Sequence, residues 1–186
     1  MQIIVFSWVS RTGKSTAITT LSEKFQQQGK TVKIYPETAQ IYIDNNPGPI
    51  TDRYSFQRHI VDEEIKRLQE IQTLKSSNTY DIVLIDRTFA DMFVYIYRGI
   101  IHDYIQNPDL LSCTQELSKS KELYDEIIFF DTMIIEDKNF ADYNNDDINT
   151  IFKHTLNSIY QDKIKYYPNN TYFEKNIDIF IKKYMK

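Results

Sequence analysis

The sequence predicts an α/β fold in which a mostly parallel, five-stranded sheet is covered by helices on both faces. Short apolar runs alternate along the chain with longer stretches whose apolar residues recur at helical spacing. No internal repeat or low-complexity block interrupts this alternation. Such a pattern is typical of strand-helix-strand units with parallel strands.

Four runs rich in β-branched and aromatic residues are predicted to be strands, and most of them have the continuous apolar character of strands buried on both faces. They span residues 2–6, 31–35, 81–86 and 126–131. Pro36 stops the second run. A fifth, short strand is predicted near residues 170–173.

Helices are predicted where apolar residues recur every three or four positions. These segments span residues 14–28, 56–71, 89–100, 148–159 and 177–184. Gly29 is expected to close the first helix, and 45–49 reads as a loop. The whole chain, 1–186, is expected to form a single domain.

Composition excludes several classes of protein. With 41% hydrophobic residues the chain can form a core, and its net charge of −4 is opposite to that of a general nucleic-acid binder. Its one cysteine, Cys113, forbids an internal disulfide. No segment approaches the length of about 18 apolar residues that a membrane span needs, so we expect a soluble, cytoplasmic protein without membrane partners.

The loop after the first predicted strand ends in Gly-Lys-Ser-Thr at 13–16. A helix N-terminus offers unpaired N–H groups and a positive dipole end to an anion. Lys14 adds a charge for terminal phosphates, Ser15 offers a hydroxyl to Mg²⁺, and Gly13 lets the backbone turn without a Cβ striking the nucleotide. We therefore predict a phosphate-binding loop whose nucleotide contacts are Arg11, Thr12, Gly13, Lys14, Ser15 and Thr16.

Trp8 occupies the position where such loops usually have their first glycine. A position that requires a positive φ would be strained or blocked by this side chain. We expect the ring to turn outward, to pack or to cover the site, because the rest of the loop is intact. A chance Gly-Lys-Ser-Thr is the alternative, and its placement between a strand and an amphipathic helix argues against it.

Two other predicted strands end in charged residues. Asp86 and Arg87 end the third strand and Glu37 follows the second, at the edge of an open α/β sheet where ligands collect. Asp86 can hold Mg²⁺, Arg87 can clamp a phosphoryl group, and Glu37 can orient or deprotonate an acceptor hydroxyl. The alternatives are a strand-end salt bridge for Asp86 and a helix N-terminal acid for Glu37. Asp91 either faces the pocket or is a first-turn charge of the next helix.

These motifs resemble those of the P-loop small-molecule kinases, especially the compact group that includes nicotinamide ribonucleoside kinase-like AAA domains, deoxynucleoside kinases and thymidylate kinases. The resemblance extends through most of the chain and implies a three-layer P-loop NTPase fold, with Mg²⁺ as cofactor and ATP as phosphoryl donor. It implies Glu37 as general base, and metal and phosphate contacts for the Asp86-Arg87-Thr88 motif with its later Asp91.

The resemblance also implies substrate contacts on two helices. Ser55-Phe56-Gln57 is similar to the Phe-Gln pair with which deoxynucleoside kinases hold a base edge, which implies Gln57 as a reader of the base. Tyr95 and Tyr97 resemble the substrate-helix tyrosines of thymidylate kinases, although the abundance of tyrosine in the chain (14 residues) favours core packing.

The segment 132–147 corresponds to the possible lid, which is rich in arginine in this family. Here residues 136–142 contain only one cation, Lys138. A missing arginine matters, because an arginine at the transferring phosphoryl group can contribute ~10³-fold in rate. Arg11, Arg53 or Arg58 could substitute; otherwise the segment is a plain solvated loop, and the enzyme is slow or no longer a kinase.

The prediction is a Mg²⁺–NTP-dependent kinase that transfers the γ-phosphoryl group to a nucleoside or nucleotide-like small molecule. The candidate residues are Lys14, Glu37, Asp86 and Arg87 for catalysis, Ser15 and Asp86 for the metal, and Arg53, Gln57, Arg58 and Asp91 for the substrate. The nearest alternative is an NTP hydrolase or switch. A kinase acting within a nucleic acid strand would need Arg53, Arg58, Lys66 and Arg67 to line one groove, and a decayed loop would leave a partner-binding module. A homodimer is left open.

Overall fold

The computed structural model describes residues 1–7, 13–101, 114–130 and 145–185. Its centre is a sheet of five parallel strands in the order β2-β3-β1-β4-β5. The strands are β1 (Gln2–Ser7), β2 (Val32–Tyr35), β3 (Ile82–Asp86), β4 (Glu126–Phe130) and β5 (Ile164–Tyr167). The predicted parallel α/β sheet is thereby confirmed, and with it the three-layer P-loop NTPase fold.

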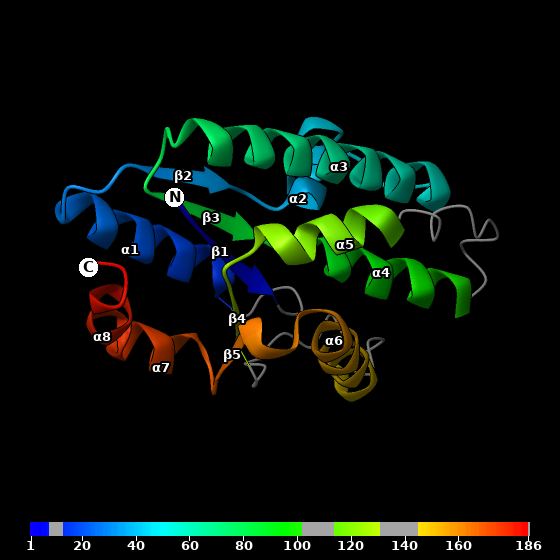
Figure 1. Cartoon of the computed structure of the whole chain (residues 1–186). Helices are drawn as coiled ribbons and strands as arrows, with labels where there is room; N and C mark the ends of the chain where they lie inside the picture. The colour runs from blue at the N-terminus through cyan, green and yellow to red at the C-terminus, as the bar shows by residue number, and fades with distance from the viewer. Residues whose placement is uncertain (8–12, 102–113, 131–144, 186) are drawn as a thin grey trace.

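Helices form a layer on each face of this sheet (Figure 1). One layer contains α1 (Lys14–Gln27), α7 (Asn170–Lys175) and α8 (Ile177–Lys182), which pack against one another. The other contains α3 (Arg53–Ser77), α4 (Phe89–Ile101), α5 (Thr114–Leu123) and α6 (Asn145–Tyr160). The short helix α2 (Thr38–Asn45) packs on α3, and a 3₁₀ turn, η3 (Gln161–Lys163), leads into β5.

The three inner strands read as apolar runs because side chains on both of their faces are buried. Every residue of β3 and β4, and all but the first of β1, is buried. Aromatic rings extend this core toward α7, where Phe173 contacts Phe6 and Phe130 with ring centroids 5.8 Å apart in each pair. The rigid centre of the sheet therefore fixes where β1 and β3 end.

The predicted fifth strand was wrong in position. Residues 164–167 form β5, whereas 170–173 belong to helix α7. The side chain of Asn169 caps this helix, since its Oδ1 accepts a hydrogen bond from the Tyr172 N–H over 2.8 Å. A local N-cap thus outweighs the β propensity of the Thr-Tyr-Phe run.

Helices α2 and α5 are additions to the predicted elements, and the helix predicted over 56–71 is longer at both ends. Gly29 has a φ of 78° just after α1, which confirms it as the residue that ends this helix. Residues 131–144, most of the expected lid, lie outside the described residues, and residues 145–147 begin helix α6.

Candidate phosphoryl-transfer site

Three neighbouring strands end in polar residues at one edge of the sheet. Phe6 is in register with Asp86, so Ser7 of β1 lies beside the end of β3. Tyr35 of β2 is in register with Ile85, and Glu37 follows two residues later. The expectation that Glu37 and Asp86 share an edge is met because the parallel register aligns the ends of β2, β3 and β1.

Gly13 begins helix α1 in a left-handed conformation, with φ 81° and ψ 15°. This conformation is strained for residues with a Cβ and is readily adopted by glycine. Gly13 has no side chain to cap the helix, and amide groups at a helix start point toward an anion-binding position. Lys14 is buried, whereas Ser15 and Thr16 are exposed at the helix start. Trp8, Arg11 and Thr12 lie outside the described residues.

Lys14, Ser15 and Asp86 form the part of the site nearest the helix start. The Ser15 hydroxyl donates a hydrogen bond to Asp86 Oδ2 over 2.9 Å, and Lys14 Nζ lies 4.0 Å from Asp86 Oδ1. Burial, and then the positive charge of Arg87, lower the pKa of Lys14 to about 8, although nearby carboxylates act in the opposite direction. A bound polyphosphate would add negative charge beside this ammonium group and raise its pKa.

The oxygen atoms at Ser15 and Asp86 suit a magnesium ion. Asp86 Oδ1 is buried and accepts no hydrogen bond from the described residues. Mg²⁺ prefers oxygen ligands and is often bound through one or two carboxylates together with substrate phosphates. Within the described ranges no three His, Cys, Asp or Glu side chains converge as a metal centre.

Arg87 connects the ends of β3 and β2. Its Nε donates to Glu37 Oε1 over 2.5 Å, and its NH1 lies 3.8 Å from Asp91 Oδ2. The guanidinium carbon lies 5.2 Å from the centre of the Tyr95 ring, within the range of a cation–π contact. The backbone N–H of Arg87 donates to Phe6 O over 2.8 Å, and its φ of 84° is unusual for a residue with a side chain.

Glu37 precedes the first residue of α2, as the helix-acid alternative expected, but its side chain does not cap this helix. The carboxylate instead pairs with Arg87. Burial disfavours its charge, but the positive charges of Arg87 and Lys14 outweigh burial and hold the pKa of Glu37 below its ordinary value. Glu37 is therefore an ionised carboxylate at neutral pH, with 23% of its side chain exposed.

Asp91 has the first-turn position that was one of its two expected roles. It lies in the first turn of α4 and is fully buried beneath the strand ends. Its Oδ1 accepts hydrogen bonds from the hydroxyls of Ser7, over 2.7 Å, and Thr88, over 2.5 Å. Burial raises the pKa of Asp91 to about 6, against the effect of Arg87 and these hydrogen bonds. This environment makes Asp91 a support beneath Arg87, in place of the predicted substrate contact.

The other predicted substrate residues lie at the start of α3, which extends past the ends of β2 and β3 (Figure 1). Arg53 and Arg58 are exposed and Gln57 is half-buried. Arg58 Nε pairs with Asp62 on the same helix over 3.2 Å. All three side chains therefore lie near the start of α3.

The nucleic-acid alternative requires four cations in one groove, but of these only Lys66 and Arg67 line the groove beside α3, without Arg53 and Arg58. Arg67 is buried and pairs with Glu64 over 2.9 Å, whereas Lys66 is exposed and pairs with Glu63 over 2.6 Å. Lys66 and Arg67 are thus each paired with a carboxylate on their own helix.

No helix among the described residues is long and apolar enough to cross a bilayer.

Sequence reasoning did not foresee the roles of three residues that support this site. Ser7 and Thr88 hold Asp91, and Arg67 holds the segment before α2. Arg67 had a signal, because it and Glu64 interrupt the apolar stripe of the long helix at positions that face the core. Charged residues on a buried stripe are rare unless they are paired.

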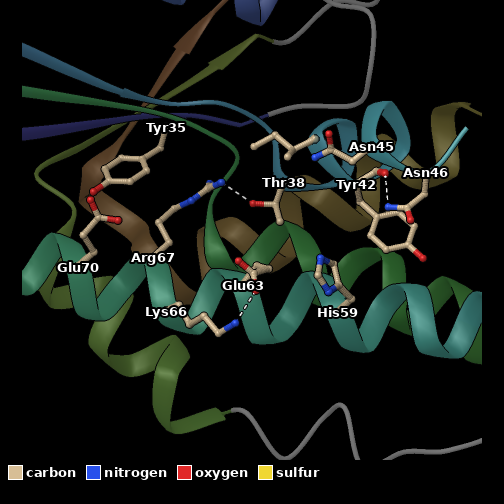
Figure 2. Close-up of a pocket in the computed structure, with 11 residues that line it drawn as sticks. Tyr35, Thr38, Tyr42, Asn45, Asn46, His59, Glu63, Lys66, Arg67 and Glu70 are labelled. Carbon is tan, nitrogen blue, oxygen red and sulfur yellow. Dashed lines mark hydrogen bonds and ion pairs between the residues drawn. The ribbon is translucent and has the colours of Figure 1, made fainter.

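A groove of about 610 Å³ lies between α2 and α3 (Figure 2). It is lined by polar side chains of both helices and of β2, among them Tyr35, Thr38, Tyr42, Lys66 and Arg67. None of the four predicted catalytic residues lines it. The groove is therefore bordered by Tyr35 and Thr38, on either side of Glu37 in the chain, but not by Glu37 itself.

Solved structures with the same fold include nucleoside and nucleotide kinases. A deoxyadenosine kinase from M. mycoides with bound dATP aligns with a TM-score of 0.60 and 14% identity, covering 98% of each chain. A thymidylate kinase from Ehrlichia chaffeensis aligns over 100% of this chain and 98% of its own, with a TM-score of 0.62 and 11% identity. A thymidylate kinase from Candida albicans aligns over 100% of this chain and 93% of its own, with a TM-score of 0.63 and 17% identity.

Comparison at the level of sequence gives no match, either to a protein-family model or to a curated protein. At identities of 11–17% the likeness to the solved structures is one of fold. The P-loop kinase type of fold suspected from the motifs is thereby confirmed.

Proposed function

We propose that the chain is a Mg²⁺-dependent kinase that transfers the γ-phosphoryl group of a nucleoside triphosphate to a hydroxyl of a nucleoside-like small molecule. One observation carries the proposal: a continuous set of close charges joins Lys14 and Asp86 to Arg87 and Glu37, from the ends of three strands. Proteins with this fold act on deoxyadenosine and thymidylate, as their names state, and one of them binds dATP.

On the donor side, the start of α1 would bind the polyphosphate. Its first-turn amide groups and the Lys14 ammonium would hold the β- and γ-phosphates. Ser15 and Asp86 would hold Mg²⁺, which supplies charge neutralisation on the phosphates when bound. The contacts proposed for Arg11 and Thr12 belong to the same donor site.

On the acceptor side, Glu37 would bind and deprotonate the hydroxyl of the acceptor. As an ionised carboxylate it can accept a hydrogen bond from the acceptor O–H and take up its proton as the oxygen attacks phosphorus. A bond forms between the acceptor oxygen and the γ-phosphorus, the bond from that phosphorus to the β–γ bridging oxygen breaks, and the nucleoside diphosphate leaves. Arg87 would stabilise the equatorial oxygens of the transferring group.

A hydroxyl acceptor suits these charges better than a phosphate acceptor. Glu37 and Asp91 are both carboxylates, and Arg87 is already shared between them. An acceptor phosphate would place further negative charge beside Glu37, which like-charge repulsion disfavours. Arg53, Gln57 and Arg58, at the exposed start of α3, are the proposed contacts for the rest of the acceptor. A cytoplasmic location and a homodimer stay predictions.

The test is a transfer assay with γ-labelled ATP or GTP, Mg²⁺ and a panel of nucleosides, nucleoside monophosphates and single-stranded oligonucleotides. We expect label in a nucleoside 5′-monophosphate product, and none with Lys14→Met. Label found only in free phosphate would identify a hydrolase instead. Label in a nucleoside diphosphate would move the acceptor to a nucleotide, and label in an oligonucleotide would revive the nucleic-acid alternative.

A further inference from the structure

The segment that carries Glu37 is held from behind by one buried side chain of α3. Arg67 NH2 donates a hydrogen bond to Pro36 O over 2.7 Å and another to Thr38 Oγ1, so it binds the residues on both sides of Glu37. Its guanidinium carbon also lies 5.5 Å from the centre of the Tyr35 ring. Figure 2 shows Arg67 reaching from α3 toward Thr38.

Glu64 completes this arrangement. Its Oε1 lies 2.9 Å from Arg67 NH1 and accepts a hydrogen bond from the Thr38 hydroxyl. Thr38, Glu64 and Arg67 are 7%, 3% and 8% exposed. We call these three residues the Arg67 clamp.

Stability alone is a poor explanation for the clamp. A buried ion pair often contributes no more than well-packed apolar residues of similar volume. Here Glu64 Oε2 is buried without a hydrogen-bond partner among the described residues, which adds a cost. What the clamp does provide is a fixed backbone at residues 36–38.

That backbone determines whether Glu37 meets Arg87. The two side chains approach to 2.5 Å across the ends of β2 and β3. β2 is a short edge strand, paired only with β3 within the described sheet, so it cannot by itself hold its C-terminal extension firmly. Glu37 thus lies between two arginines: Arg87 binds its carboxylate, and Arg67 binds the chain on either side of it.

We infer that Arg67, held by Glu64 and Thr38, is a positioning residue that keeps the Glu37 carboxylate against Arg87 in the orientation needed for proton transfer. This inference rests on the proposed function for its catalytic meaning, and on the geometry alone for its effect on Glu37. Loss of the clamp frees residues 36–38, separates Glu37 from Arg87 and returns the carboxyl to an ordinary environment.

The test uses the full chain in two substituted forms. Arg67→Ala removes the guanidinium and leaves a space that opens onto the groove between α2 and α3. The double variant Glu64→Gln/Arg67→Met removes both charges together and leaves no unpaired buried ion, so it is the form that folds if Arg67→Ala does not. Lys66→Met is the matched control, because this neighbouring cation is exposed and pairs only at the surface.

Two measurements are made on each form. The first is the pKa of Glu37, from the carboxyl ¹³C shift of glutamate-labelled protein, assigned by the signal that Glu37→Gln removes. The second is kcat and KM for the transfer reaction. We expect the pKa of Glu37 to rise in both clamp variants and kcat to fall about tenfold or more, at an unchanged KM for MgATP. Free guanidinium at millimolar concentration should restore part of kcat to Arg67→Ala, and none to Lys66→Met.

The outcomes separate this inference from the proposed function. The Arg67 charge by itself lowers the pKa of Glu37, so the decisive form is the double variant, which removes two opposite charges together. If the wild type transfers no phosphoryl group and the pKa of Glu37 still rises in the double variant, the positioning role stands and the proposed function fails. If the wild type is active and the pKa of Glu37 is the same in every form, the positioning role is overturned. A lower kcat with an unmoved pKa also overturns it, since the substitutions then act elsewhere.

Discussion

Arg87 donates from Nε to Glu37 Oε1 over 2.5 Å, and this contact joins the end of β3 to the residue that follows β2. The two residues are 50 positions apart in the chain, and only the parallel register brings them together. The pairing leaves Glu37 charged and Arg87 oriented before any ligand binds. Preorganisation of this kind lowers the cost of reaching a transition state that develops charge at the same place.

Glu37→Gln should remove the proposed base while keeping the size of the side chain. We expect kcat to fall by about 10²- to 10⁴-fold, because general base catalysis contributes that much. The Kd for MgATP should stay near the wild-type value, since the donor contacts lie at the start of α1. Steady-state kinetics with the best nucleoside and calorimetry with a nonhydrolysable triphosphate measure the two quantities.

Glu37→Asp is the control that keeps the negative charge and shortens the side chain. It keeps a carboxylate but shortens the side chain by one methylene, so we expect a kcat between those of the wild type and Glu37→Gln. An unchanged turnover in Glu37→Gln would exclude the base and favour a hydrolase or switch.

Lys14 should make nucleotide binding sensitive to alkaline pH. Its pKa in the free protein is lowered to about 8, mainly by burial. Bound phosphates favour the charged form, so binding takes up a proton above this pH. We expect the affinity for MgATP to be constant below about pH 8 and to fall by up to about tenfold per unit above it, as measured by calorimetry.

Lys14→Met is the control for this effect, because it has no proton to gain. Its affinity should be lower at neutral pH and nearly flat between pH 7 and 9. The same alkaline fall in Lys14→Met and in the wild type would assign the titration to the nucleotide or to another group.

Ser15 and Asp86 should determine the Mg²⁺ concentration that activity requires. Ser15→Ala removes the hydroxyl that donates to buried Asp86, so its cost in folding should be about 1 kcal/mol. The Mg²⁺ concentration for half-maximal activity should also rise, because one oxygen ligand is lost. A Mg²⁺ titration at fixed nucleotide concentration measures this, and Thr19→Ala, at an exposed position of the same helix outside the predicted nucleotide contacts, is the matched control.

Asp86→Asn should raise the magnesium requirement further, because it removes the charge that the metal binds. An equal requirement in the wild type, Ser15→Ala and Asp86→Asn would place the metal on other residues.

Asp91 should make stability depend on pH in the direction opposite to most carboxylates. Its pKa is raised in the folded protein to about 6 from an unfolded value of 3.8. Between these values the folded state binds more protons than the unfolded state, so the Asp91 contribution to stability falls as pH rises. Relative to Asp91→Asn, the wild type should lose about 2 kcal/mol of unfolding free energy from pH 4 to pH 6.

Urea unfolding of both proteins across this pH range tests the prediction, and the difference between their unfolding free energies isolates Asp91 from other carboxylates. A difference that does not change with pH would mean that Asp91 is charged throughout, and that its ion pair with Arg87 outweighs its burial.

The inner strands of the sheet were predictable because burial on both faces leaves a continuous apolar run. β5 was misplaced because it lies at the edge, where Lys165 and Tyr166 are exposed and break such a run. Helix α2 carries its large apolar residues Ile41 and Ile43 on exposed positions, so it shows no buried stripe. Helical periodicity reports burial on one face, and α2 has little of it.

The strand-end candidates were predictable from their order along the chain, because parallel strands place their carboxyl ends at one edge. The partners of each candidate were not. Ser7 and Asp91 are 84 positions apart, and their hydrogen bond depends on the register of β1 with β3 and on the first turn of α4. Similarly, Gln57 was assigned to the site from a motif, and Arg53 and Arg58 as substitutes for a lid arginine. Their placement depends on how far α3 extends beyond the sheet.

The left-handed backbone at Arg87, with a φ of 84°, has an evolutionary consequence. A conformation of this kind costs of order 1 kcal/mol for a residue with a side chain, and glycine would adopt it without that cost. Selection for folding alone therefore favours drift from arginine to glycine at this position, and only a need for the guanidinium opposes it. Among descendants of the same ancestor, a glycine here would mark lineages that kept the architecture after the chemistry was lost.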